Sequence, residues 1–266
     1  MVNKITFKQY LLEAEENILR AKSKLDLRRS IVDGHFTKDG SKLKVTGDFK
    51  CNNTSLVSLV GLPQKIKWNF DCRNTQITSL VGGPKQVGGS FECSHLPELT
   101  SLKGAPETID GNFKCTNNAK LTSLVGLPNV MGGAFDCGDN AELASLIGGP
   151  QRVLTWFNCS KNPQLESLEG APQYIRSDFY CNDNPKLTSL ARINFYIHAI
   201  GEQAHFTGCP IKSNILGLLK ISGLKKVYFD DKKLQQIINK YLPMGDSTDC
   251  IDDLLDAGYS KEYCKW

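Results

Sequence analysis

Hydrophobic and polar positions along the middle of this chain recur with a period of 21 or 22 residues. Each repeat contains the pair Phe-x-Cys and then a segment of the type Leu-x-Ser-Leu-x-Gly-x-Pro, as in residues 121–128. The cysteines of the seven pairs are Cys51, Cys72, Cys93, Cys115, Cys137, Cys159 and Cys181. A fixed period of this length is typical of stacked repeats, so the pattern predicts a solenoid of seven rungs, each rung being one repeat.

The pattern inside one repeat predicts how a rung is built. The segment Val-x-Gly-x-Phe-x-Cys alternates with period two, which is typical of a strand with one buried face, so Phe and Cys are expected to point inward together. Glycine and proline then turn the chain, and the leucines pack from the opposite side. Because one repeat cannot bury its apolar face alone, we expect the rungs to stack through short parallel strands.

Two polar columns accompany the hydrophobic ones. An asparagine stands three residues before the first Leu (Ile in the second repeat) in all repeats but the third, and a serine follows that residue by two in every repeat. Both columns are expected to bond turn backbone from rung to rung, because bending leaves backbone groups without partners. The asparagines are Asn53, Asn74, Asn118, Asn140, Asn162 and Asn184.

The two ends of the chain depart from the repeat and predict caps. Residues 6–25 predict an amphipathic helix, and Asp39-Gly40 predicts a short hairpin before the first rung. After residue 190 we expect one imperfect rung and then helices over 214–219, 231–241, 247–256 and 260–266. The predicted organisation is an N-terminal helix and cap (1–42), a solenoid (43–190) and a C-terminal helical cap (191–266), β-rich and α+β overall.

Composition and charge narrow the function classes. A formal net charge of +4 is too small to favour nucleic acid as a partner. The longest apolar runs are far shorter than a membrane span, and the first residues lack the apolar core of a secretory signal. We therefore expect no membrane association, and ten cysteines without an export signal favour a reducing compartment.

The repeat resembles the leucine-rich repeat, Leu-x-Leu-x-x-Asn, with Phe and Cys in place of two leucines. It is most similar to the short, helix-poor repeats of tailed-bacteriophage proteins and of some secreted bacterial effectors. The resemblance spans about residues 43–190, and it implies a leucine-rich-repeat-like fold and a binding scaffold. Such scaffolds have many different partners, so the resemblance is specific for fold and weak for function.

The N-terminus carries a second, shorter resemblance. Residues 6–14 are similar to the capsid-targeting leaders of phage internal head proteins, which end in Leu-or-Ile-x-Glu before a small residue. Leu11, Glu13 and Ala14 fit that processing rule. The alternative is an ordinary capping helix. The two resemblances imply a phage-encoded protein in the host bacterial cytoplasm, and the leader leaves packaging in the virion open.

The seven cysteines of the repeat invite a metal or redox interpretation, which we weigh against packing. All seven share one strand register and do not converge on a point, and Cys-x-x-Cys spacing is absent. We therefore expect them to be buried, reduced and metal-free. His198, His205 and Cys209 lie together where the repeat ends, but their spacing matches no zinc motif. No catalytic residue, metal or cofactor is expected.

Large aromatic side chains interrupt the outward columns of the strands in two neighbouring repeats. Trp156 and Tyr180 are expected to face solvent, because each lies at an odd offset from an inward Phe or Cys. Exposed Trp and Tyr on a polar surface are typical binding anchors. We predict a partner site around this pair with Asn158, Lys114, Asp136 and Asp178; the alternative is that residues 191–266 cover both rings. Trp68 is expected to lie in the core.

These observations favour a non-enzymatic protein–protein interaction scaffold. A phage origin would make the partner a host protein, for example a defence protein or a host enzyme that is inhibited. A second hypothesis is an internal or minor structural component of the phage head, which would share the leader. A third is an enzyme with its site in 191–266, where candidate acids, bases and nucleophiles are few.

Overall fold

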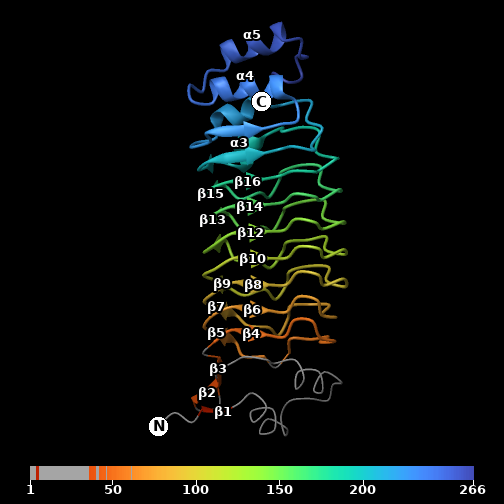
Figure 1. Ribbon diagram of the computed structural model, residues 1–266, viewed down its shortest axis with the longest axis vertical. Coiled ribbons are helices and arrows are strands. Elements are labelled where there is room, and N and C mark those ends of the chain that lie inside the picture. Colours follow the sequence, from red (N-terminus) through yellow and green to blue (C-terminus); the bar gives the residue numbers. More distant parts are fainter. Residues whose placement is uncertain (1–3, 6–35, 40–41, 46, 61) are drawn as a thin grey trace.

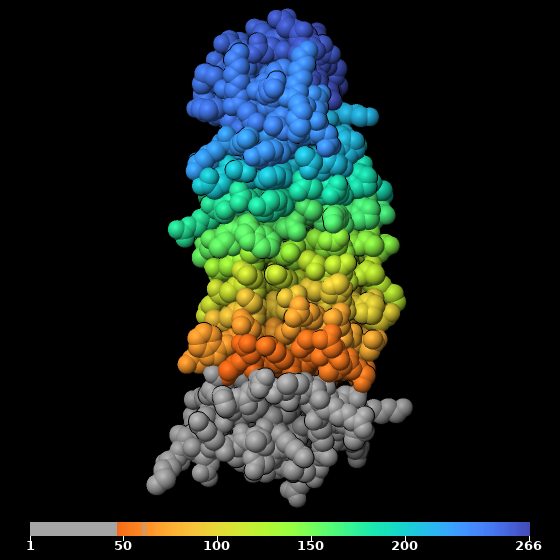
Figure 2. Space-filling view, viewed as in Figure 1, coloured from red at the N-terminus to blue at the C-terminus, as the bar shows by residue number. Residues whose placement is uncertain are grey.

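The protein forms one elongated column of stacked turns. The computed structural model describes residues 4–5, 36–39, 42–45, 47–60 and 62–266. Figure 1 shows the short strands stacked along the column, with the first strands at one end and the helices of the C-terminus at the other. Figure 2 shows that side chains fill the turns into a continuous solid body. The predicted solenoid is confirmed.

The principal sheet has nine strands and is parallel throughout. Its strands pair in register, with Phe113 opposite Phe91 on one side and Phe135 on the other. Same-direction strands with a full turn of chain between them follow from the repeat. The strands are β4 (Phe49–Lys50), β6 (Phe70–Asp71), β8 (Phe91–Glu92), β10 (Phe113–Lys114), β12 (Phe135–Asp136), β14 (Phe157–Asn158), β16 (Phe179–Tyr180), β18 (Gln203–His205) and β19 (Lys226–Tyr228).

A second ladder of strands lies just before the first in each turn. It belongs to a six-stranded sheet in the order β1-β2-β3-β5-β7-β9 and a four-stranded sheet in the order β11-β13-β15-β17. The strands are β1 (Lys4–Ile5), β2 (Phe36–Asp39), β3 (Lys42–Val45), β5 (Lys65–Ile66), β7 (Gln86–Val87), β9 (Thr108–Ile109), β11 (Val130–Met131), β13 (Arg152–Val153), β15 (Tyr174–Ile175) and β17 (Ala199–Ile200). From β3 onward the pairing is parallel, whereas β2 and β3 form the predicted antiparallel hairpin with Asp39 opposite Lys42.

The alternating segment of each repeat is therefore two short strands and not one. The chain turns a corner between them, and glycines occupy several of the corner positions. At Gly111 a Cβ would lie 2.6 Å from the carbonyl carbon of Gly89 in the preceding rung, so the close approach of the corners requires glycine. The prediction of a single strand was wrong because period two continues across a bend that the pattern does not mark.

The ladder also runs past the seventh rung. β18 pairs with β16, and β19 pairs with β18, although neither strand contains Phe-x-Cys. Ala204 stands opposite Phe179, and the rings of Phe206 and Phe229 fill the interior two residues after Ala204 and Val227. The expectation of only one imperfect rung after residue 190 was wrong, because the fold tolerates loss of the motif where apolar volume is retained.

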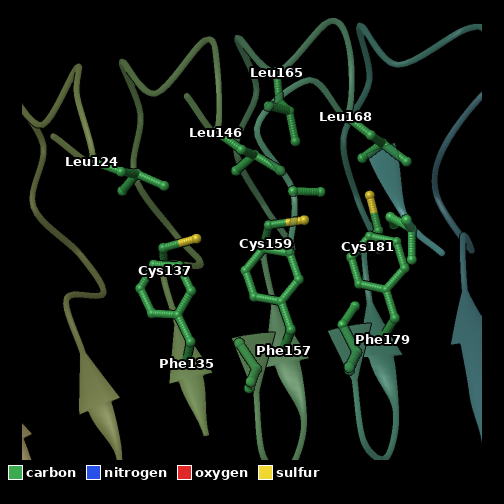
Figure 3. Packing of buried hydrophobic residues seen from close by; sticks show 14 of the residues in the cluster. Leu124, Phe135, Cys137, Leu146, Phe157, Cys159, Leu165, Leu168, Phe179 and Cys181 are labelled. Atoms are coloured by element: carbon green, nitrogen blue, oxygen red, sulfur yellow. The ribbon is translucent and has the colours of Figure 1, made fainter. Parts of the chain in front are cut away.

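The interior is built from columns of identical residues. Neighbouring phenylalanine rings from Phe49 to Phe179 have centroids 5.0–6.0 Å apart, and all but the Phe113–Phe135 pair are stacked. The cysteine of each rung lies beside its phenylalanine, and leucines close the core from the other side (Figure 3). Seven ladder cysteines and seven ladder phenylalanines are fully or almost fully buried, as predicted.

Four of the six predicted asparagines form a buried column, and the other two do not. Asn118, Asn140, Asn162 and Asn184 are fully buried and bond the turns of neighbouring rungs. Asn53 and Asn74 instead have positive φ and are exposed, and Thr54 and Thr75 follow them and bond the carbonyls of Cys51 and Cys72. The first two turns are one residue shorter, so counting back from the first Leu selected the wrong position.

Most serines of the serine column bond within their own rung. The Ser58 hydroxyl oxygen accepts a hydrogen bond from the Val60 backbone N–H at 3.2 Å, and Ser79 accepts one from Val81 in the same way. Such a contact stabilises a local turn. Ser189 makes the same local contact and also donates to Asn214 Oδ1 in the next turn at 2.9 Å. The predicted bonding from rung to rung is therefore met at Ser189, through a side chain, while Ser58 and Ser79 bond locally.

Helices cover the C-terminal end of the column (Figure 1). The short α3 (Ile193–Tyr196) and the 3-10 helix η1 (Leu216–Lys220) lie within the last turns, and α4 (Lys232–Tyr241) and α5 (Thr248–Asp256) follow β19. The Asp231 side chain caps α4 by accepting from the N–H groups of Lys233 and Leu234. Residues 260–266, predicted as a helix, form turns. The predicted helix over 6–25 and the leader residues Leu11, Glu13 and Ala14 lie outside the described residues.

Candidate functional site

Four aromatic side chains form a strip on the outer face of the principal sheet. Tyr180, His205 and Tyr228 stand directly opposite one another on β16, β18 and β19. The rings of Tyr180 and His205 stack at 4.8 Å, and those of His205 and Tyr228 at 4.5 Å. Trp156 meets Tyr180 edge-on at 6.3 Å. We call these four residues the aromatic strip; all four are half-buried, so part of each ring faces solvent.

A hollow of about 480 Å³ opens beside the strip, over rungs five to seven. Its apolar part is made by Trp156 and Tyr180, whose rings contact each other edge-on. Its polar part consists of Asp139, Asn158, Ser160, Lys161, Asn182 and Asp183. A concave site with aromatic walls and a few polar groups is the usual form of a binding site.

Hydrogen bonds between rungs order several of these polar side chains. The Asn158 side-chain amide donates to Asp136 Oδ1 at 2.9 Å, and Asn158 Oδ1 accepts from the Ser160 N–H at 2.9 Å. Ser160 in turn accepts from the Asn182 N–H at 3.0 Å. Side chains that are already held in place lose little conformational entropy when a ligand binds. The site is therefore preorganised.

Burial favours the neutral form of two residues of the strip. It lowers the pKa of His205, with the Asp178 carboxylate opposing the shift, and it raises the pKa of Tyr180 with help from Asp178. Burial also raises the pKa of Asp136, and the Gly138 N–H and the Asn158 amide oppose that shift. A neutral His205 ring stacks on its two tyrosine neighbours without adding a charge between them.

The structure brings some of the predicted site residues together and separates one from the rest. Trp156, Tyr180 and Asn158 line the same hollow. Asp136 accepts the bond from Asn158, and Asp178 Oδ2 accepts one from the Tyr180 hydroxyl at 3.4 Å. Lys114 instead lines a different hollow, over rungs one to four, together with Lys50, Asp71 and Glu92.

The predicted competition between exposure and a C-terminal cover has a mixed outcome. Residues after 190 do contact Tyr180, but through the His205 ring of the next strand, which stacks beside it. They extend the aromatic surface, and both Trp156 and Tyr180 remain half-exposed. Sequence reasoning missed His205 and Tyr228. The segments Ala204-His205-Phe206 and Val227-Tyr228-Phe229 were the available signal, because each repeats the inward Phe one residue after an outward aromatic residue.

Trp68, expected in the core, lies on the surface. Its side chain is 52% exposed, and the Lys67 ammonium lies 5.6 Å from its ring centroid. The residue falls in the corner between β5 and β6, where strand alternation does not apply. Trp68 is therefore an exposed Trp that lies several rungs away from the aromatic strip.

The buried thiols have the character of packing groups. Burial raises the pKa of the Cys93 and Cys115 thiols well above the ordinary value, and neighbouring thiols add to the shift. A thiolate is the reactive form of cysteine, so such thiols are poor nucleophiles. All ten cysteines are free. Among the residues described, no group of three or more His, Cys, Asp or Glu side chains is arranged to hold a metal ion.

Comparison with known proteins adds no relative to this picture. No protein-family model, curated protein or solved structure matches the chain. Within the described part of the chain, no helix has the length and apolar character needed to cross a bilayer.

Proposed function

We propose that this protein is a non-catalytic interaction scaffold that binds a protein partner through the aromatic strip and the adjoining hollow. The observation that supports this most directly is the run of four half-exposed aromatic rings across adjacent strands. Each such ring can bury about 150–250 Å². Covering such a surface with a partner removes apolar area from water, which favours binding.

The rigidity of the strip favours recognition. Tyr180 and His205 stand on strands that pair in parallel on both sides, Tyr228 stands on the last strand of the sheet, and the rings support one another through stacking. Tyr and Trp provide large contact area at low cost in side-chain entropy. Fixed rings with an ordered polar rim can distinguish partners by shape and hydrogen bonding.

A protein partner suits the composition of this face. The hollow holds Asp139, Asp183 and Lys161, so both signs of charge surround the rings. This arrangement matches the mixed polar rim and apolar centre of protein interfaces. The outer face of rungs one to four is also mixed, with Lys50, Lys114, Asp71 and Glu92.

The source of the partner is proposed from sequence resemblance alone. If the repeat belongs to a phage, the partner is a host bacterial protein, and binding would inhibit or redirect it. A role as an internal head component remains the alternative. Mass spectrometry of purified particles separates the two, because a head component must be present in the particle.

The test compares two tryptophan surfaces on one scaffold. The double variant Trp156→Ala, Tyr180→Ala should lose at least about 100-fold in affinity for a partner captured by the wild type, since each ring is the type of anchor that contributes about 2 kcal/mol or more. The matched control is Trp68→Ala, which removes an exposed Trp elsewhere on the column. Affinity is measured by titration calorimetry, and folding by the melting temperature.

Two outcomes of this comparison argue against the proposal. If the double variant binds as well as the wild type, the strip is not the recognition surface. If the double variant melts many degrees lower and binding falls only in proportion to unfolding, the rings are structural. Equal loss in Trp68→Ala would show that binding depends on aromatic exposure in general.

A further inference from the structure

A second hollow lies on the neighbouring face of the column, before the corner that leads to the aromatic strip. It has a volume of about 330 Å³ and lies over β13, β15 and β17. Arg152, Tyr174 and Arg176 line it together with Leu154 and small residues of the next turns. This hollow shares no lining residue with the hollow beside the aromatic strip.

The charge of this hollow is unbalanced. Two arginines line it, and its lining contains no Asp or Glu. Three other hollows of the described surface, by contrast, each include at least one carboxylate. Among the ion pairs of the described residues, none involves Arg152 or Arg176. Positive charge in a concave surface concentrates the field and attracts anions.

The walls combine these cations with exposed apolar groups. The Arg152 guanidinium lies 5.1 Å from the Tyr174 ring centroid, and the ring of His198 meets Tyr174 edge-on at 5.7 Å. Tyr174 is 43% exposed and Leu154 is 37% exposed. A guanidinium held against an aromatic ring keeps its outer N–H groups free to bind an oxyanion.

Small residues line another part of the hollow; they are Gly201, Ser222 and Gly223. At Gly201 a Cβ would lie 1.9 Å from the Arg176 carbonyl oxygen, so the two turns approach this closely only because residue 201 is glycine. The Ser222 hydroxyl in this lining is a further hydrogen-bond donor group.

We propose that this hollow binds a phosphate monoester carried on an aromatic or aliphatic body. A phosphate monoester has a charge of about −1.5 to −2 at neutral pH, which complements two unpaired arginines. Its oxygens match the fork of a guanidinium, and its apolar body would lie on Tyr174 and Leu154. The same chemistry is offered by a free small molecule and by a phosphorylated side chain of a peptide.

The experiment measures binding of four probes to the full chain by titration calorimetry at low ionic strength. The probes are inorganic phosphate, phenyl phosphate, a short phosphotyrosyl peptide and benzoate. Phenyl phosphate should bind more tightly than inorganic phosphate because of the apolar wall. Arg176→Gln and Arg152→Gln should each weaken phenyl phosphate binding about tenfold or more. The control is Lys65→Gln, which removes a cation from the position equivalent to Arg152 on β5.

The outcomes separate the source of the ligand from failure of the proposal. Tighter binding of the peptide identifies a phosphorylated segment, and equal binding identifies a free small molecule. The proposal is overturned if phenyl phosphate does not bind, if Lys65→Gln weakens binding as much as Arg176→Gln, or if benzoate binds as tightly as phenyl phosphate. The melting temperature of each variant checks that the solenoid is intact. Tyr174→Leu, which keeps both arginines, should weaken the binding of phenyl phosphate but not that of inorganic phosphate.

Discussion

The side-chain oxygen of Asn140 accepts a hydrogen bond from the backbone N–H of Asn118, one rung earlier, at 2.8 Å. The amide group of Asn140 donates to the carbonyl of Cys115 in that rung and to the carbonyl of Cys137 in its own. One side chain thus bonds three backbone groups of the buried turns. The relation repeats from Asn118 to Asn184, and it explains how a tight, buried turn can be stacked without cost to each rung.

Replacing Asn140 with Ala should destabilise the protein by about 2–3 kcal/mol. The carbonyls of Cys115 and Cys137 would each keep one amide donor, from Asn118 and Asn162 respectively. The Asn118 N–H, in contrast, would lose its hydrogen-bond acceptor. The expected cost therefore comes from one buried N–H without a partner and from two carbonyls that each have one donor fewer. Urea unfolding measures the change. The control is Asn129→Ala. Asn129 is exposed and lies outside the asparagine column, so its replacement should change the free energy of unfolding by less than about 0.5 kcal/mol.

Replacing Phe113 with Ala should cost about 3–5 kcal/mol. Its ring lies between those of Phe91 at 5.4 Å and Phe135 at 6.0 Å, and strands on both sides hold the rung apart, so the void cannot close. Phe195→Ala provides the matched comparison, because that ring is 63% exposed. Thermal and urea unfolding should show that Phe113→Ala is clearly less stable than Phe195→Ala. An equal loss of stability in both variants would contradict the phenylalanine stack as the main source of packing energy.

The sequence predicted those parts of the fold that depend only on the burial of apolar side chains. Inward Phe and Cys had to be buried at every turn, and the period therefore revealed the stacking, the parallel pairing and the core. The prediction that Trp68 lies in the core was wrong because the corner before Phe70 ends the strand alternation on which that prediction depended. The prediction that Asn53 belongs to the asparagine column was wrong because the first two turns are one residue shorter, which only the backbone conformation reveals.

The candidate sites were less accessible to the same reasoning. Trp156 and Tyr180 stood out as large residues in polar columns, but His205 and Tyr228 follow degenerate turns whose register depends on strand pairing. The arginine-lined hollow joins residues at positions 152, 176, 201 and 223, on four successive turns. No local sequence pattern marks residues that only the stacking of turns brings together.

The buried thiols predict a steep loss of stability at alkaline pH. Burial raises the pKa of Cys115 well above the ordinary thiol value of 9.0, while the unfolded chain ionises near that value. Because the folded pKa is the higher one, the stability contribution is complete below pH 9 and is lost as pH rises further. Each such thiol should add about 1.4 kcal/mol per pH unit to the slope of unfolding free energy. Cys115→Ala should reduce the slope by that amount.

The control for this alkaline slope is a variant that destabilises the core without removing a titrating group. Leu121→Ala meets this condition, since Leu121 is fully buried in the same rung. It should lower stability at every pH and leave the slope above pH 9 unchanged. If Cys115→Ala and wild type lose stability in parallel between pH 9 and 10.5, Cys115 ionises in the folded protein and is not sealed in the core.

The end of the principal sheet is protected by side chains of α4. β19 has no further strand beyond it, yet Asn239 on α4 accepts from the Val227 N–H at 2.7 Å and donates to the Val227 carbonyl at 3.0 Å. Gln235 accepts from the Phe229 N–H at 3.2 Å. An unprotected edge strand pairs with other chains. The helix therefore imitates a neighbouring strand and stops the ladder.

Opening this edge should convert the protein into a self-associating one. The double variant Gln235→Ala, Asn239→Ala leaves α4 its buried Leu234 and Ile238, so the helix should remain docked while the backbone of β19 loses its partners. Those groups then bond water or the β19 edge of a second copy. Light scattering after size exclusion should show dimers whose fraction rises with concentration. Gln236→Ala, on the exposed face of the same helix, should behave as the wild type. A double variant that stays monomeric up to millimolar concentration would show that the bulk of α4, and not its amide side chains, protects the edge.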